Sequence, residues 1–172
     1  MRRKKVFLLI GQKGSGKSYI GKLFEEELGI KFIRVEDWAK RIKKDRAVNN
    51  EDYIRQVFEE IEVGIRNILE ANDRVVFEST GLTEFFDKML ANLKSNFEVV
   101  TIGVFAESKL CLERVRNRDQ SIHINVSDEQ VTMINQKVIE KNMKTDFKIL
   151  NNEENDDLLE QIKNIVKMEL ES

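Results

Sequence analysis

The chain has 172 residues, of which 41% are hydrophobic and 35% are charged, and it contains one cysteine. This composition is too apolar for a disordered chain, suits one domain with a hydrophobic core, and excludes an intrachain disulfide. The net charge of −2 gives no strong attraction to nucleic acid or to a membrane surface. No apolar run reaches the ~20 residues of a membrane span or the roughly 7–15 of a secretory signal, so we expect a cytoplasmic protein.

Short apolar runs alternate with longer segments of helical periodicity along the chain. The apolar runs predict strands at residues 6–10, 31–35, 74–77, 98–105 and 147–150. Apolar residues spaced three and four apart predict helices within residues 20–28, 54–69, 85–90, 110–115, 128–144 and 158–170. Ser127 and Gln130 form a capping-box sequence before one of these helices. The alternation predicts a parallel α/β sheet covered by helices on both faces, within a single domain spanning residues 1–172.

Ligands of such sheets bind beyond the carboxyl ends of the strands, so the residues after each strand are the candidates. After the first strand, Gly11-Gln-Lys-Gly-Ser-Gly-Lys-Ser18 matches G-x-x-x-x-G-K-[ST] at every fixed position. Glycines let successive backbone N–H groups face one anion, and the following helix adds its N-terminal partial charge. Lys17 can reach the β- and γ-phosphates, and the Ser18 hydroxyl can join a Mg²⁺ shell. This pattern predicts a P-loop, the Walker A motif, that binds ATP with Mg²⁺. Its predicted nucleotide-binding residues are Gly11, Gly14, Ser15, Gly16, Lys17, Ser18 and the adjoining Tyr19.

Two adjacent carboxylates, Glu36 and Asp37, follow the second strand. Either could accept the proton of a substrate hydroxyl or orient that hydroxyl, and the sequence leaves open which one acts. The alternative is that they form an acidic cap on the next helix. Trp38 beside them could line a substrate pocket or pack as a half-buried helix aromatic.

The segment after the third strand reads Glu78-Ser-Thr-Gly81. Ser79 and Thr80 can donate hydrogen bonds to substrate oxygens, and Gly81 permits a close backbone approach. Glu78 could contact the substrate or, like Glu36, hold Mg²⁺ directly or through water beside Ser18. The alternative is a turn with helix-capping hydroxyls.

Arg114 and Arg118 share one side of the helix that follows the fourth strand. Arg118 lies where that helix should fray into a mobile polar segment, which we expect to form a lid at about 118–127. An arginine on a closing lid can stabilise the charge of a transferring phosphoryl group. The alternative is a solvated basic face.

The chain resembles the small P-loop kinases: nucleoside monophosphate kinases, shikimate kinase, gluconate kinase and related metabolite kinases. The resemblance covers nearly the whole length and is carried by GQKGSGKS, RVRNRD and DFKILNNEEN. It implies a three-layer P-loop NTPase fold with strand order 2-3-1-4-5 and substrate-binding helices at about 37–70. It also implies that Arg118 is the lid arginine and that Arg114 lies near the adenine or the phosphates. By the same resemblance, Asn151 and Asn152 border the nucleotide.

These features predict an ATP-dependent phosphotransferase that moves the γ-phosphate to the hydroxyl or phosphate of a small molecule. One alternative is a nucleotide hydrolase or regulatory switch. It would carry Asn-Lys-x-Asp after a later strand, and this sequence offers no convincing match. Another alternative is a kinase acting on a nucleic-acid end, which the net charge of −2 disfavours. The sequence leaves open the acceptor, the preference for ATP over GTP, and whether the protein is a monomer or a homodimer.

Overall fold

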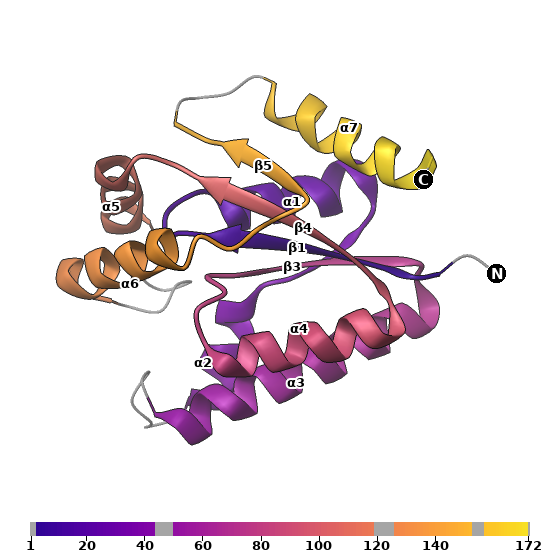
Figure 1. Cartoon of the computed structure of the whole chain (residues 1–172), viewed down its shortest axis with the longest axis horizontal. Helices are drawn as coiled ribbons and strands as arrows, with labels where there is room; N and C mark the ends of the chain where they lie inside the picture. The colour runs from indigo at the N-terminus through magenta and orange to yellow at the C-terminus, as the bar shows by residue number, and fades with distance from the viewer. Residues whose placement is uncertain (1–2, 44–49, 119–125, 153–156, 172) are drawn as a thin grey trace.

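In the computed structural model, which describes residues 3–43, 50–118, 126–152 and 157–171, one parallel sheet forms the centre of the molecule (Figure 1). Its strands are β1 (Lys5–Gly11), β2 (Lys31–Ile33), β3 (Arg74–Ser79), β4 (Glu98–Phe105) and β5 (Phe147–Leu150). Their order is β2-β3-β1-β4-β5, and every neighbouring pair is parallel. The predicted sheet and its strand order are therefore confirmed.

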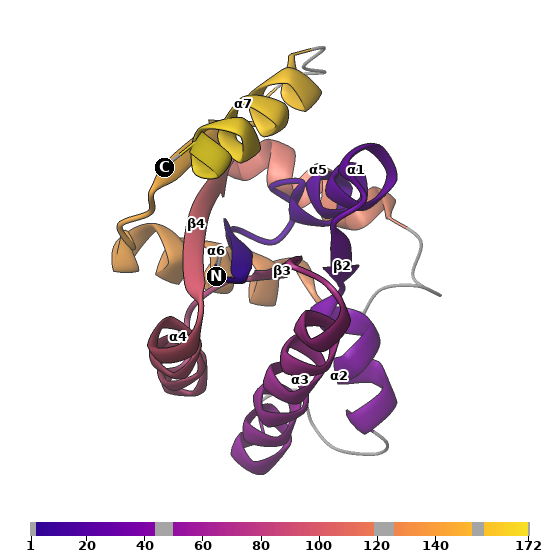
Figure 2. The same cartoon turned by 90° about the vertical axis from the view of Figure 1, so that its right-hand side faces the viewer.

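Helices cover both faces of this sheet (Figures 1 and 2). They are α1 (Lys17–Leu28), α2 (Val35–Lys43), α3 (Glu51–Ala71), α4 (Glu84–Asn96), α5 (Ser108–Asn117), α6 (Asp128–Lys141) and α7 (Leu158–Glu171). α1 and α7 lie on one face, whereas α2, α3 and α4 lie on the other. α5 and α6 lie toward the arrowheads of the strands, which mark the carboxyl ends of the strands. Among the described segments, no helix has the length and apolarity to cross a membrane.

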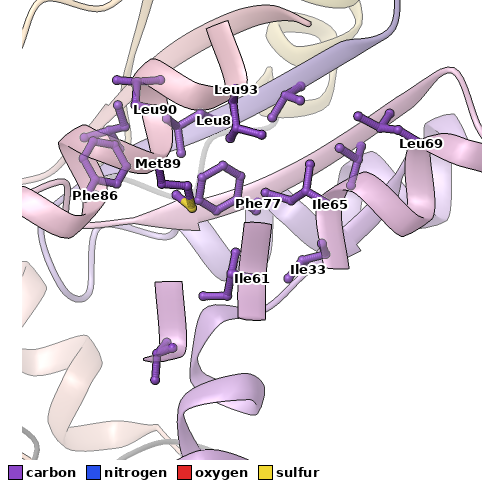
Figure 3. Packing of buried hydrophobic residues seen from close by; sticks show 14 of the residues in the cluster. Leu8, Ile33, Ile61, Ile65, Leu69, Phe77, Phe86, Met89, Leu90 and Leu93 are labelled. Atoms are coloured by element: carbon purple, nitrogen blue, oxygen red, sulfur yellow. The ribbon is translucent and has the colours of Figure 1, made fainter. Parts of the chain in front are cut away.

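Two hydrophobic cores fix β1 from opposite sides. Leu8 belongs to the core under α3 and α4, where it packs with Phe77 and Leu93 (Figure 3). Its neighbours Phe7 and Leu9 belong to the core under α1 and α7. Successive side chains of a strand point to opposite faces, so this alternation supplies both cores from one run of apolar residues. Burying each such side chain contributes about 1.5–3 kcal/mol to the free energy of folding. This packing holds the carboxyl ends of β1 and β3 in place.

Several element boundaries differ from those predicted, among them the ends of β2 and α6. β2 ends at Ile33 rather than at residue 35, and α2 begins at Val35. Glu36 and Asp37 lie in the first turn of α2, where the partial positive charge of the helix N-terminus stabilises carboxylates. α6 ends before residue 144, because Asn142 takes the left-handed backbone conformation with φ 43°.

The predicted capping box before α6 is confirmed. The Ser127 hydroxyl accepts a hydrogen bond from the Gln130 N–H, and the Gln130 side chain accepts one from the Ser127 N–H. Of the lid predicted at about 118–127, residues 119–125 lie outside the described residues. Arg118 is the C-cap residue of α5 and Ser127 is the N-cap residue of α6, so the described residues reach this segment from both sides.

Candidate active site

The predicted P-loop connects β1 to α1, as its motif requires. Gly14 and Gly16 take positive φ angles of 80° and 103°. A Cβ atom on Gly14 would lie 2.2 Å from the carbonyl oxygen of Cys111, and one on Gly16 would lie 2.2 Å from Nδ2 of Asn151. Only glycine therefore fits both positions. A turn of this kind at a helix N-terminus is the arrangement in which backbone N–H groups bind phosphate.

Lys17 begins α1 and is 7% exposed. Its ammonium donates hydrogen bonds to the carbonyl oxygens of Gly11, at 2.9 Å, and Gln12, at 2.6 Å. Burial lowers the pKa of Lys17 to about 8, and the negative charge of Glu78 partly opposes that shift. The loop thus holds a poorly hydrated cation whose protonated form would be favoured by bound phosphate.

Glu78 lies beside the P-loop because β3 pairs with β1 in the register Leu9↔Glu78 and Ile10↔Ser79. β3 is longer than predicted, so Glu78 and Ser79 are its last residues and both are buried. Burial raises the pKa of the Glu78 carboxyl, and the charge of Lys17 opposes this. The side chain of Ser79 accepts a hydrogen bond from the N–H of Gly81 at 3.0 Å and shapes the turn that follows.

An ion pair joins the end of α5 to the start of α2. Nη1 of Arg118 lies 3.4 Å from Oε1 of Glu36, and the two side chains are 14% and 15% exposed. The charge of Glu36 also acts on the pKa values of Lys17 and Glu78. The structure therefore gathers these four predicted residues at one end of the sheet.

Arg114 and Asn151 contact the backbone of the P-loop. Nη1 of Arg114 donates to the carbonyl oxygens of Gly14, at 3.3 Å, and Ser15, at 3.4 Å, and its Nη2 donates to the carbonyl oxygen of Asn151 at 2.7 Å. The buried side chain of Asn151 donates to the carbonyl oxygen of Ser15 at 2.9 Å. Asn152 accepts from the backbone N–H of Glu107 at 2.7 Å. These side chains tie the loop after β5 and helix α5 to the P-loop.

Four further predicted residues lie on α1, on α2 and in the turn after β3. Asp37 is exposed, in contrast to its neighbour Glu36. Tyr19 is 59% exposed on α1. Trp38 packs against α3, where a Cβ atom on Gly64 would lie 2.8 Å from its ring. Thr80 is half-buried in the turn after β3, next to the predicted Gly81.

The sequence did not reveal four residues that hydrogen-bond to the loops of the site or that shift the pKa values of its ionisable groups. Asn135 of α6 binds both backbone polar groups of Lys13, and Gln12 accepts from the N–H of Ala106 at 3.0 Å. Lys141 donates to the carbonyl oxygen of Gly81 at 2.5 Å, and the charge of Lys13 acts on Lys17 and Glu78. Asn135 had a detectable signal, because it is a polar residue on the stripe of α6 that also holds the buried Val131 and Val138.

The oxygen donors of the site suit Mg²⁺. Ser18 lies in the first turn of α1, and the carboxylates of Glu36 and Glu78 are close enough to influence each other. Within the described ranges, no three His, Cys, Asp or Glu side chains gather as a metal site. Mg²⁺ commonly takes only one or two protein ligands and completes its shell with phosphate oxygens and water. This donor set fits a metal that arrives with a nucleotide.

A groove of about 430 Å³ lies between α3 and α4. Its lining residues all belong to those two helices, with Phe58, Phe85 and Met89 supplying apolar surface. Because it is formed by elements other than the P-loop, we do not assign it to the nucleotide.

The fold and this site can be compared with known proteins. A family model described as an AAA domain matches residues 6–140. Shikimate kinase from Bacteroides thetaiotaomicron superposes with a TM-score of 0.65 at 17% identity, covering 99% of this chain and 100% of that chain. The Mycobacterium tuberculosis APS kinase CysC, in complex with AMPPNP and APS, gives 0.65 at 13% identity and covers 100% of both chains. The Pnkp1/Rnl/Hen1 RNA repair complex gives 0.66 at 12% identity, covering 84% of this chain and 48% of that chain. At these identities the structures establish the fold alone.

No curated protein sequence matches the chain significantly. The family model nevertheless spans well over half of the chain, and it includes the P-loop, Glu78 and Arg118. The kinase structures share the fold that the resemblance to P-loop kinases implies, so that part of the prediction is confirmed. The chain belongs to the AAA domain family that this model describes.

Proposed function

We propose that this protein is an ATP-dependent phosphotransferase that moves the γ-phosphate of ATP to a small-molecule hydroxyl or phosphate. The observation that carries the proposal is the buried ammonium of Lys17 at the mouth of a glycine cradle, with Glu78 on the neighbouring strand. A cradle of this kind binds polyphosphate, and the carboxylates around it suit an acceptor group that must be oriented.

Lys17 and the P-loop backbone would hold the β- and γ-phosphates. Arg114 and Asn151 support this by fixing the carbonyl oxygens of Gly14 and Ser15, which leaves the loop little freedom to rearrange. A preorganised loop loses less conformational entropy when the nucleotide binds, and this raises affinity. Mg²⁺ held by the Ser18 hydroxyl, with Glu78 or Glu36 directly or through water, would neutralise charge on the phosphate oxygens.

Of the two candidate carboxylates, we assign Glu36 the task of orienting the acceptor or accepting its proton. Its side chain is largely buried and paired with Arg118, whereas Asp37 is exposed. The same ion pair places Arg118 beside the carboxylate, where its guanidinium could stabilise charge on the transferring phosphoryl group. Ser79, Thr80 and Gly81 border this region from the end of β3 and could contact the acceptor.

A screen for ligands tests this function directly. Thermal unfolding is measured with a non-hydrolysable ATP analogue, with the corresponding GTP analogue, and with a panel of metabolites and a 5′-hydroxyl RNA. A ligand at about 100 times its Kd should add roughly 2.7 kcal/mol to the free energy of unfolding. Hits are then incubated with ATP labelled on the γ-phosphate. Label on a metabolite supports the proposal, label on RNA favours a nucleic-acid kinase, and release of phosphate alone favours a hydrolase or switch.

Replacing Arg118 with alanine should lower kcat at least about tenfold while changing the KM of ATP less. The reason is that a guanidinium acting on the transferring phosphoryl group is needed most in the transition state. Steady-state kinetics with the acceptor found in the screen provide the measurement. Arg116→Ala is the matched control, since Arg116 lies on the same helix, is exposed and pairs with the exposed Asp128. An unchanged kcat in Arg118→Ala would show that Arg118 does not act on the transferring phosphoryl group.

A further inference from the structure

Asn135 makes a two-point contact with the P-loop from outside it. Its Oδ1 accepts a hydrogen bond from the backbone N–H of Lys13 at 2.8 Å, and its Nδ2 donates one to the carbonyl oxygen of Lys13 at 3.0 Å. The residue is 4% exposed, so both hydrogen bonds are shielded from water. Shielded hydrogen bonds of this kind hold geometry firmly, because breaking one leaves a buried polar group unpaired.

The second of these hydrogen bonds determines the direction of a donor in the P-loop. The carbonyl of Lys13 and the N–H of Gly14 belong to the same peptide group, which is planar and trans. In a trans peptide the oxygen and the hydrogen point in opposite directions. Because Asn135 holds the oxygen toward α6, the N–H of Gly14 is held pointing away from α6.

Helix α6 is itself anchored on both sides of Asn135, so it can act as a fixed support. Val131 and Val138 bury the same face of the helix, and the capping box closes its first turn. At its other end, Lys141 donates to the carbonyl oxygen of Gly81 and pairs with Asp87 at 2.9 Å. The helix therefore contacts both the P-loop and the turn after β3, the two segments that would hold the nucleotide and the acceptor.

We infer that Asn135 is a positioning residue that orients the peptide group between Lys13 and Gly14, so that the N–H of Gly14 is preset to receive phosphate. This inference rests on the proposed function, since it assumes that the phosphates of a nucleotide bind in the glycine cradle. It assigns α6 a role in nucleotide affinity that the P-loop motif alone does not contain. The amide is the side chain suited to the task, because it offers one acceptor and one donor side by side.

The test compares ATP binding by calorimetry in wild type, Asn135→Ala and Val138→Ala, well below the unfolding temperature of each. We expect the Kd of ATP to rise about tenfold in Asn135→Ala, since the Gly14 peptide is then free to rotate. Val138→Ala removes buried packing from the same face of α6 and should lower thermal stability without changing this Kd. A purely structural role for Asn135 would make the two variants behave alike, and a wild-type Kd in Asn135→Ala would overturn the inference.

Asn135→Asp separates the two hydrogen bonds. A carboxylate can still accept from the Lys13 N–H, but it repels the Lys13 carbonyl oxygen instead of donating to it. We expect its Kd for ATP to rise at least as much as in Asn135→Ala, and a wild-type value would show that orientation of the Gly14 peptide is unimportant. If the wild-type protein itself fails to bind ATP, the proposed function fails, which is a different result from wild-type affinity in the variants.

Discussion

Lys17→Ala should lower kcat/KM for phosphoryl transfer by roughly 10³-fold or more, because it removes the cation that the P-loop holds for the phosphates. The ammonium is almost completely buried, so little water competes with phosphate for its charge. The fold should survive, because removing the lysine relieves the cost of burying its charge. This gain offsets the loss of its hydrogen bonds to Gly11 and Gln12. Phosphoryl-transfer kinetics and a thermal unfolding curve provide the two measurements.

The same variant should lose a pH dependence that the wild type shows. The pKa of Lys17 is lowered to about 8 by burial, and bound phosphate would raise it by favouring the protonated form. ATP affinity of the wild type should therefore fall as pH rises above about 8, by up to about tenfold per pH unit. Below that pH Lys17 is already protonated, and affinity should be nearly constant.

Lys22→Ala, which replaces an exposed lysine on the same helix, should keep both the rate and the pH profile. A normal rate in Lys17→Ala would contradict the kinase assignment.

Local sequence patterns predicted the parts of the fold that depend on local chemistry. The strand at 98–105 and the strand at 147–150 were predicted with the bounds that the structure has. The P-loop was equally predictable from the sequence, because its glycines, Lys17 and Ser18 must occupy fixed positions in one continuous segment. The predicted proximity of Glu78 to this loop also followed, since parallel strands bring their carboxyl ends to one edge of the sheet.

Contacts between distant segments were not predictable in the same way. Asn135 and Lys13 are 122 positions apart, and nothing near either residue in the sequence specifies their pairing. Arg114 and Asn151 were expected near the nucleotide by resemblance, whereas the structure adds that they bind the P-loop backbone. The choice between Glu36 and Asp37 also needed the structure, because it depends on which residue of the first turn of α2 is buried against its neighbours.

Gly14→Ala should weaken ATP binding about 100-fold or more and lower stability, for two separate physical reasons. Alanine in the left-handed backbone conformation, which Gly14 adopts with φ 80°, costs roughly 1–2 kcal/mol. In addition, the new Cβ would lie 2.2 Å from the carbonyl oxygen of Cys111. That oxygen is part of the backbone of α5 and cannot swing aside as the end of a side chain could, so the P-loop itself must move. A displacement of about 1 Å in a group that positions the substrate can lower a reaction rate 10²-fold, and we expect a comparable loss of ATP affinity here.

Gly29→Ala separates the two reasons, because Gly29 ends α1 with φ 66° and an added Cβ there would meet no atom within 4 Å. In this control only the strain of alanine in the left-handed backbone conformation lowers the free energy of unfolding. Its Tm should therefore fall by only ~2–4 °C for each kcal/mol lost. Its Kd for ATP should equal that of the wild type, since the end of α1 lies away from the P-loop. If Gly14→Ala bound ATP as tightly as Gly29→Ala does, the contact between the P-loop and α5 would not constrain the nucleotide site. A large difference between the two would instead show that α5, the helix whose C-cap residue is Arg118, helps to set the shape of the phosphate cradle.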